Sequence, residues 1–251
     1  MGLALSRRAA GAKGGAGASS LVDSPYDLGG GSERVLADVN RIGRPLASFK
    51  RGDRVHGAGG MAIPRHRGYS YVLDAAPGNL TEIESLAGFD PELTPGEILM
   101  LGAFEGKYLN DSVSEFPAEW FLGALMTGSL SPAGADPARC NYFEIKSRLP
   151  LAEWRRGGWV SRKGGKKGDD DRYGGVLADP AVNPDERGWF QWYCRYWMGR
   201  RLPEIDMIQI KRWRSFRRHA GAIRANCRPG DLTCRPRERQ ALLQWAYNPF
   251  I

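Results

Sequence analysis

The sequence has few of the residues that build metal or thiol sites. It contains four cysteines and three histidines in 251 residues, and no Cys-x2-Cys pair. Four cysteines in a chain of this length are too few for the disulfide framework of a small secreted domain. We therefore expect their thiols to be reduced. Cys194, His219, Cys227 and Cys234 match a tetrahedral zinc site in number, but their spacing is unusual for structural zinc. We therefore expect no metal, and cysteines that act as small buried apolar groups.

Long apolar runs and early acidic residues are also lacking. The sequence contains no run of about 18 apolar residues, which is the length needed to span a bilayer. The N-terminus also lacks the apolar core of a signal peptide. No acid precedes Asp23, whereas Arg7, Arg8 and Lys13 lie among Ala, Gly and Ser. This composition is typical of an organellar transit peptide and equally of a disordered tail. We expect no membrane span and an intracellular protein, in a mitochondrion or chloroplast or otherwise in the cytoplasm, with residues 1–33 disordered or targeting-like.

The overall composition indicates a helix-rich protein with many turns. Glycine (33) and proline (16) make up about a fifth of the chain, while 42% of residues are apolar and 25% charged. We predict an irregular, helix-rich α+β fold: one globular domain over residues 34–251 with a few short strands, and a basic helical part over 184–251. No phosphate-cradling glycine loop precedes a predicted helix, which disfavours a nucleotide-cofactor enzyme, and we expect no cofactor.

Local signals place several elements before residue 150. Thr94 as N-cap, Pro95 at the first position and Glu97 at the third predict a helix start with a capping box. A second helix is expected from Pro117, with an apolar face of Trp120, Phe121, Leu125 and Met126. Short strands are expected at residues 69–73 and 141–145.

The last 70 residues predict three helices. The first should start at Asn183 and Pro184 and stop at Gly199, with six aromatic residues between them that are best explained by burial. The second should run from Pro203 to about Ala225, and a third should follow residue 236.

The predicted helix over 203–225 has one apolar and one basic face. At 100° per residue, six apolar residues share one arc: Ile205, Ile208, Trp213, Phe216, Ala220 and Ile223. Lys211, Arg214 and Arg218 fall opposite, flanked by Arg217 and Arg224. Residues 195–239 carry thirteen Lys or Arg against four Asp or Glu, a net of +9, whereas the whole chain carries +8. Twelve of the thirteen are arginines, which suit bidentate phosphate contacts, so the five residues named are the predicted nucleic-acid-binding residues.

These residues also carry a resemblance. The segments GWFQWYCRY (188–196), RW (212–213), RH (218–219) and CRPRERQALLQWAY (234–247) resemble a family of uncharacterised proteins of bacteria, algae and plants. The similarity extends upstream through FEGKY (104–108) and EFPAEWF (115–121). The family has no established activity, so the resemblance implies no catalytic residue and no substrate.

Three functions stay open from the sequence. The first is non-enzymatic binding of RNA or DNA, within a larger ribonucleoprotein or organellar assembly. The second is a metal-dependent nuclease, in which Asp136 and a strand-borne Glu144 and Lys146 would hold Mg²⁺ and orient a water against a phosphodiester. The third is a protein-interaction subunit whose basic face docks an acidic partner. We favour the first, and thus a protein that is not an enzyme.

Overall fold

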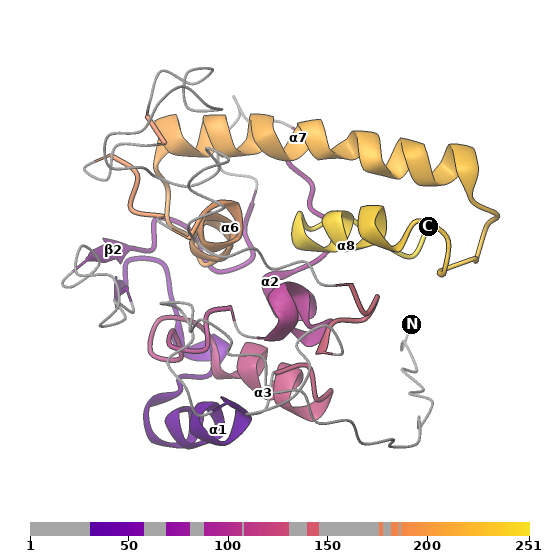
Figure 1. Ribbon diagram of the computed structural model, residues 1–251. Coiled ribbons are helices and arrows are strands. Elements are labelled where there is room, and N and C mark those ends of the chain that lie inside the picture. The colour runs from indigo at the N-terminus through magenta and orange to yellow at the C-terminus, as the bar shows by residue number, and fades with distance from the viewer. Residues whose placement is uncertain are drawn as a thin grey trace, which may run out of the picture.

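The fold consists of short helices and one small strand pair. The computed structural model describes residues 31–57, 69–80, 88–106, 108–130, 140–145, 176–177, 182–185 and 187–251. They contain six α-helices and one two-stranded sheet (Figure 1). The predicted helix-rich α+β class is confirmed. No helix in these ranges is both long and apolar enough to cross a bilayer.

The sheet is an antiparallel pair of three-residue strands. β1 (Arg54–His56) pairs with β2 (Ser70–Val72), and Val55 lies opposite Tyr71. Both of these side chains are buried, and their neighbours along the strands point outward, as the two-residue period of a strand requires. The strand predicted around residue 71 is confirmed.

Three helices form the N-terminal half of the described fold. α1 (Gly31–Ile42) and α2 (Pro95–Met100) both pack against α3 (Ala118–Met126), in the lower part of Figure 1. The predicted capping box of α2 is confirmed. Thr94 Oγ1 accepts a hydrogen bond from the Glu97 backbone N–H, and the Glu97 carboxylate accepts one from the Thr94 N–H. Short 3-10 helices occupy Leu46–Ser48 (η1) and Ala103–Gly106 (η4).

The C-terminal half consists of α6 (Trp189–Trp197), α7 (Pro203–Asn226) and α8 (Pro236–Gln244). α7 runs along one edge of the molecule, with α6 and α8 packed on its inner side (Figure 1). The predicted burial of the aromatic residues of α6 is confirmed for all but the half-buried Trp197. The Phe89 ring lies at the centre of this core, 5.0–6.1 Å from four other ring centroids: Trp192, Tyr193, Tyr196 and Trp213.

Several sequence-based predictions are wrong. Residues 141–145 form a turn and not a strand, because the Asn141 side chain bonds both the N–H and the C=O of Ile145. Asn183 does not cap a helix, because its side chain bonds local backbone in a turn and α6 begins at Trp189. Met126 is 88% exposed and does not belong to the buried face of α3.

The prediction also missed α1. This helix buries Val35 and Val39, four residues apart on one face, in a region for which no helix was predicted. The predicted N-terminal segment 1–33 lies almost wholly outside the described residues.

Candidate nucleic-acid interface

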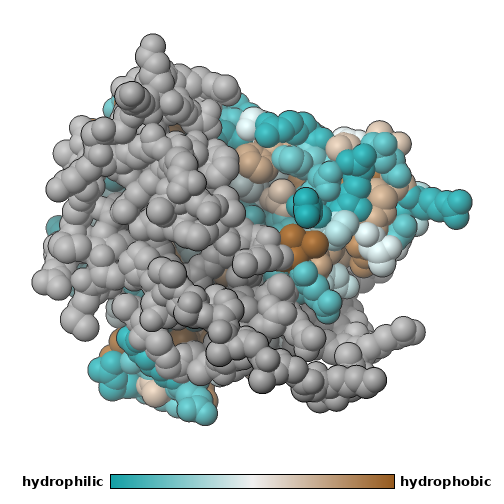
Figure 2. All heavy atoms as spheres, in the orientation of Figure 1, coloured by the Kyte–Doolittle hydropathy of each residue, from teal (hydrophilic) through white to brown (hydrophobic). Residues whose placement is uncertain are grey.

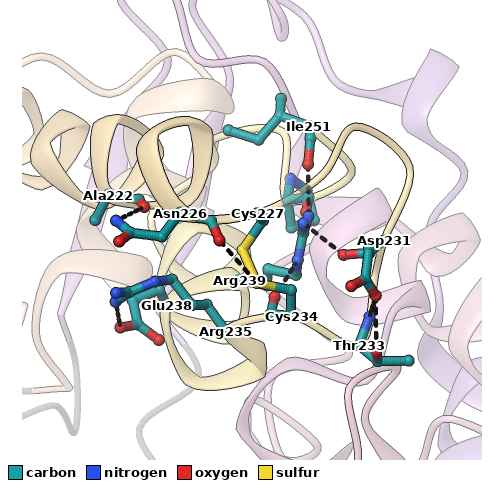
Figure 3. Close-up of a disulfide and its surroundings, with 11 residues drawn as sticks. Ala222, Asn226, Cys227, Asp231, Thr233, Cys234, Arg235, Glu238, Arg239 and Ile251 are labelled. Atoms are coloured by element: carbon teal, nitrogen blue, oxygen red, sulfur yellow. Dashed lines mark hydrogen bonds and ion pairs between the residues drawn. A yellow bond between two sulfur atoms is a disulfide. The ribbon is translucent and has the colours of Figure 1, made fainter.

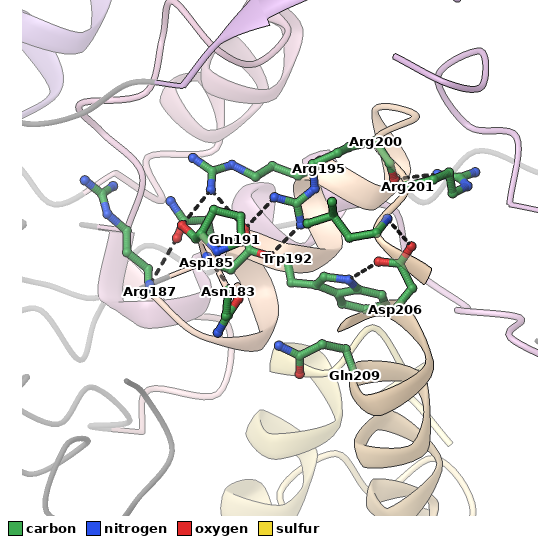
Figure 4. Close-up of polar contacts among 12 residues, drawn as sticks. Asn183, Asp185, Arg187, Gln191, Trp192, Arg195, Arg200, Arg201, Asp206 and Gln209 are labelled. Carbon is green, nitrogen blue, oxygen red and sulfur yellow. Dashed lines mark hydrogen bonds and ion pairs between the residues drawn. The ribbon is translucent and has the colours of Figure 1, made fainter. Parts of the chain in front are cut away.

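The position of α7 is fixed at its N-terminal end. Pro203 occupies the first helical turn, where its missing N–H costs no hydrogen bond. The Asp206 carboxylate accepts hydrogen bonds from the backbone N–H of Leu202 and from Trp192 Nε1, both at 2.7 Å (Figure 4). Burial raises the pKa of this carboxyl to about 6, and both hydrogen bonds oppose that rise. Asp206 thereby ties the start of α7 to α6.

The inner face of α7 is apolar, as predicted. Ile205, Ile208, Trp213, Ala220 and Ile223 are buried, and Phe216 is half-buried. The amphipathic pattern therefore decides which face of the helix packs against the rest of the protein.

The outer face of α7 is basic. All five predicted binding residues are exposed: Lys211, Arg214, Arg217, Arg218 and Arg224. Figure 2 shows mainly hydrophilic residues, with some apolar ones among them, over the right-hand part of the edge that α7 occupies in Figure 1. We call these five residues the basic face.

Most of the basic face lacks an acidic partner. Within the described ranges, Lys211, Arg217, Arg218 and Arg224 form no ion pair. Arg218 instead donates to the Ser215 carbonyl at 3.0 Å. Adjacent unpaired cations repel one another, so the basic face favours any anion that can neutralise several of them at once.

Other arginines of the C-terminal region do not contribute to this surface. Four of the thirteen basic residues counted between 195 and 239 are buried: Arg195, Arg200, Arg212 and Arg239. Arg239 donates to four backbone carbonyls, which include those of Cys234 and Pro249. The net charge of this region therefore overstates the charge available to a partner.

Arg195 and Arg200 belong to a buried ion-pair network (Figure 4). Asp185 accepts hydrogen bonds from Arg195 Nη1 at 2.9 Å and from Arg200 Nη1 and Nη2 at 2.9 and 2.5 Å. Arg195 Nε also donates to Glu115 at 2.6 Å. Burial alone would raise the pKa of Asp185, but Arg200 and Arg195 outweigh it and lower that pKa. No local pattern in the sequence predicts this network, because Glu115 lies 80 positions from Arg195.

The cysteines form a disulfide and not the four reduced thiols that were expected. Cys227 and Cys234 are bonded to each other, and they close the loop between the end of α7 and the start of α8 (Figure 3). Cys140 and Cys194 are buried and do not take part in this disulfide. Burial raises the pKa of the Cys194 thiol well above its usual value, which disfavours the thiolate that a metal needs. Among the described residues, no group of three or more His, Cys, Asp or Glu could hold a metal ion.

The predicted nuclease residues are not brought together by the described structure. Glu144 is exposed in a turn with φ +52°, so it is not strand-borne. Asp136 and Lys146 lie outside the described residues. The nuclease hypothesis required Glu144 to lie on a strand, and the structure places it in a turn.

Comparison with known proteins gives no independent assignment. No protein-family model, no curated protein and no solved structure matches the chain.

Proposed function

We propose that this protein is a non-enzymatic nucleic-acid-binding protein whose basic face contacts the phosphate backbone. The observation that supports the proposal most is the row of exposed cations on α7, four of which have no carboxylate partner within the described ranges. Four of the five are arginines, whose planar guanidinium can contact phosphate oxygens through two parallel hydrogen bonds. An intracellular or organellar ribonucleoprotein is the setting that we propose for it.

The dimensions of the basic face fit several phosphates. Lys211 and Arg224 are thirteen residues apart on one helix, which is about 20 Å at 1.5 Å per residue. That length corresponds to about six nucleotide steps along one strand of duplex DNA. If all five residues touch phosphate, the logarithm of the affinity should fall with the logarithm of salt concentration with a slope of about 3.5–4.5.

Phosphate contacts alone would not select a sequence, because phosphates carry no base identity. The nine-residue connection between α7 and α8 is also longer than the tight turn of a DNA-reading helix-turn-helix. The proposed binding is therefore independent of nucleotide sequence. The alternative ligand of the basic face is an acidic partner protein.

A salt titration of purified protein against mixed-sequence oligonucleotides tests the proposal. The variant Arg217→Ala with Arg224→Ala removes two exposed guanidinium groups that flank the face opposite the buried arc, so folding should survive. Affinity should fall about equally for unrelated sequences, and the salt slope should decrease by about 1.4–1.8.

The control is Arg41→Ala with Lys50→Ala, which removes the same charge at exposed positions in α1 and shortly after η1, although Arg41 is ion-paired with Asp38. α1 lies at the opposite end of the molecule from α7 (Figure 1). An equal loss of affinity in both double variants would show that only net charge matters. Protein that binds polyglutamate but no oligonucleotide would overturn the proposal in favour of an acidic partner.

A further inference from the structure

A continuous column of aromatic rings leads from the core to the outer part of α7. Successive ring centroids are 5.1, 4.7, 3.8 and 5.3 Å apart, and the interplanar angles are 19°, 25°, 12° and 37°. In order, the rings belong to Tyr193 and Trp189 of α6, Trp245 just after α8, and Phe216 and His219 of α7. The first three pairs are stacked, whereas the rings of Phe216 and His219 are tilted relative to each other.

Burial decreases along this column. Tyr193 and Trp189 are 1% and 5% exposed, whereas Trp245, Phe216 and His219 are half-buried. The column is therefore anchored in the core at one end and reaches solvent at His219. A ring held in this way loses little conformational freedom when another ring packs against it.

The half-buried end of the column adjoins Arg218 of the basic face. Arg218 precedes His219 in the chain, and its guanidinium carbon lies 5.4 Å from the Phe216 ring centroid. Burial lowers the pKa of the His219 imidazole and the positive charge of Arg218 lowers it further, although Glu238 opposes both. The imidazole is therefore mainly neutral at pH 7, and it offers an aromatic surface rather than another cation.

We infer that the ligand of the basic face is single-stranded nucleic acid, one base of which stacks on His219 at the end of the aromatic column. This inference rests on the proposed function and narrows its substrate class. In a duplex the bases are stacked on one another, so a protein reaches phosphates and base edges but not the aromatic faces of the bases. Unpaired bases expose their aromatic faces, and cations beside an anchored ring bind backbone and base together.

The test compares a 12-nucleotide mixed-sequence single strand with its duplex in fluorescence anisotropy at one salt concentration. The wild-type protein should bind the single strand more tightly. His219→Ala should weaken single-strand binding about 5-fold or more, the lower limit for one base stacked on an aromatic side chain, and should leave duplex binding unchanged. His219→Tyr should retain the affinity, because it keeps an aromatic ring and lacks the imidazole nitrogens.

His56→Ala is the matched control, since His56 is an exposed histidine on β1. Equal affinity for single strand and duplex, with no effect of His219→Ala, would overturn the inference. If the Arg217→Ala, Arg224→Ala variant still lowered the salt slope, the proposed function would stand, and only the inference about single strands and His219 would be rejected. If neither nucleic acid bound and polyglutamate did, both would fall.

Discussion

Replacing Asp185 with asparagine should destabilise the protein strongly. The side chain is 1% exposed and accepts three hydrogen bonds from Arg195 and Arg200. Arg195 would keep Glu115 as a charged partner, whereas Arg200 would keep no carboxylate partner among the described residues, only neutral acceptors such as the amide oxygen of the new asparagine and the Tyr69 hydroxyl at 3.2 Å. Removing one partner of a buried ion pair costs about 3–5 kcal/mol, so we expect the lower end, about 3 kcal/mol.

Urea unfolding at pH 7 measures this cost, with Asp90→Asn as the control. Asp90 is an exposed carboxylate, and its substitution should change the free energy of unfolding by less than about 0.5 kcal/mol. A cost below about 1 kcal/mol for Asp185→Asn would refute the reasoning, because the two arginines would then tolerate the loss of their shared carboxylate.

The same variant has a defined pH dependence. The pKa of Asp185 is lowered in the folded protein, because its two arginine partners outweigh the effect of burial. Its stabilisation is therefore complete above the unfolded aspartate pKa of about 3.9, and it is lost as the pH falls through the lower folded pKa. The difference in stability between the wild type and Asp185→Asn should shrink in this acidic range. A difference that stays constant there would show that the carboxyl does not act through its charge.

Two further predictions concern the backbone and the disulfide. Gly102→Ala should destabilise the protein, because Gly102 has a φ of +71° and an added Cβ would lie 1.8 Å from the Cys140 carbonyl oxygen. Gly221 lies in the interior of α7 with open space around it, so Gly221→Ala should stabilise the protein by about 0.5–1 kcal/mol. The urea unfolding midpoints of both variants test this, and equal shifts of the two midpoints would contradict it. Alkylation of unfolded protein should label two cysteines without reductant and four with it, because Cys227 and Cys234 are bonded. Four labelled cysteines without reductant would show that this bond is absent in the purified protein.

The sequence alone determined the elements whose signals are local. The capping box at Thr94 and the amphipathic period over 203–225 placed α2 and α7 correctly, because both patterns act between residues at most a few positions apart. The same period determined that Lys211, Arg214 and Arg218 face solvent, since the apolar arc opposite them must be buried. The exposed position of the candidate binding residues could thus be predicted from the sequence.

Only the tertiary structure decided which charges are internal and which rings meet. Arg195 and Arg218 look alike in sequence, but Arg195 is fully buried because Glu115, 80 residues away, lies against it. The stack of Phe216 on Trp245 likewise joins residues of separate segments, brought together where α7 packs on α8. Spacing along the chain carries no information about such pairs, because the fold and not the local backbone sets their distance.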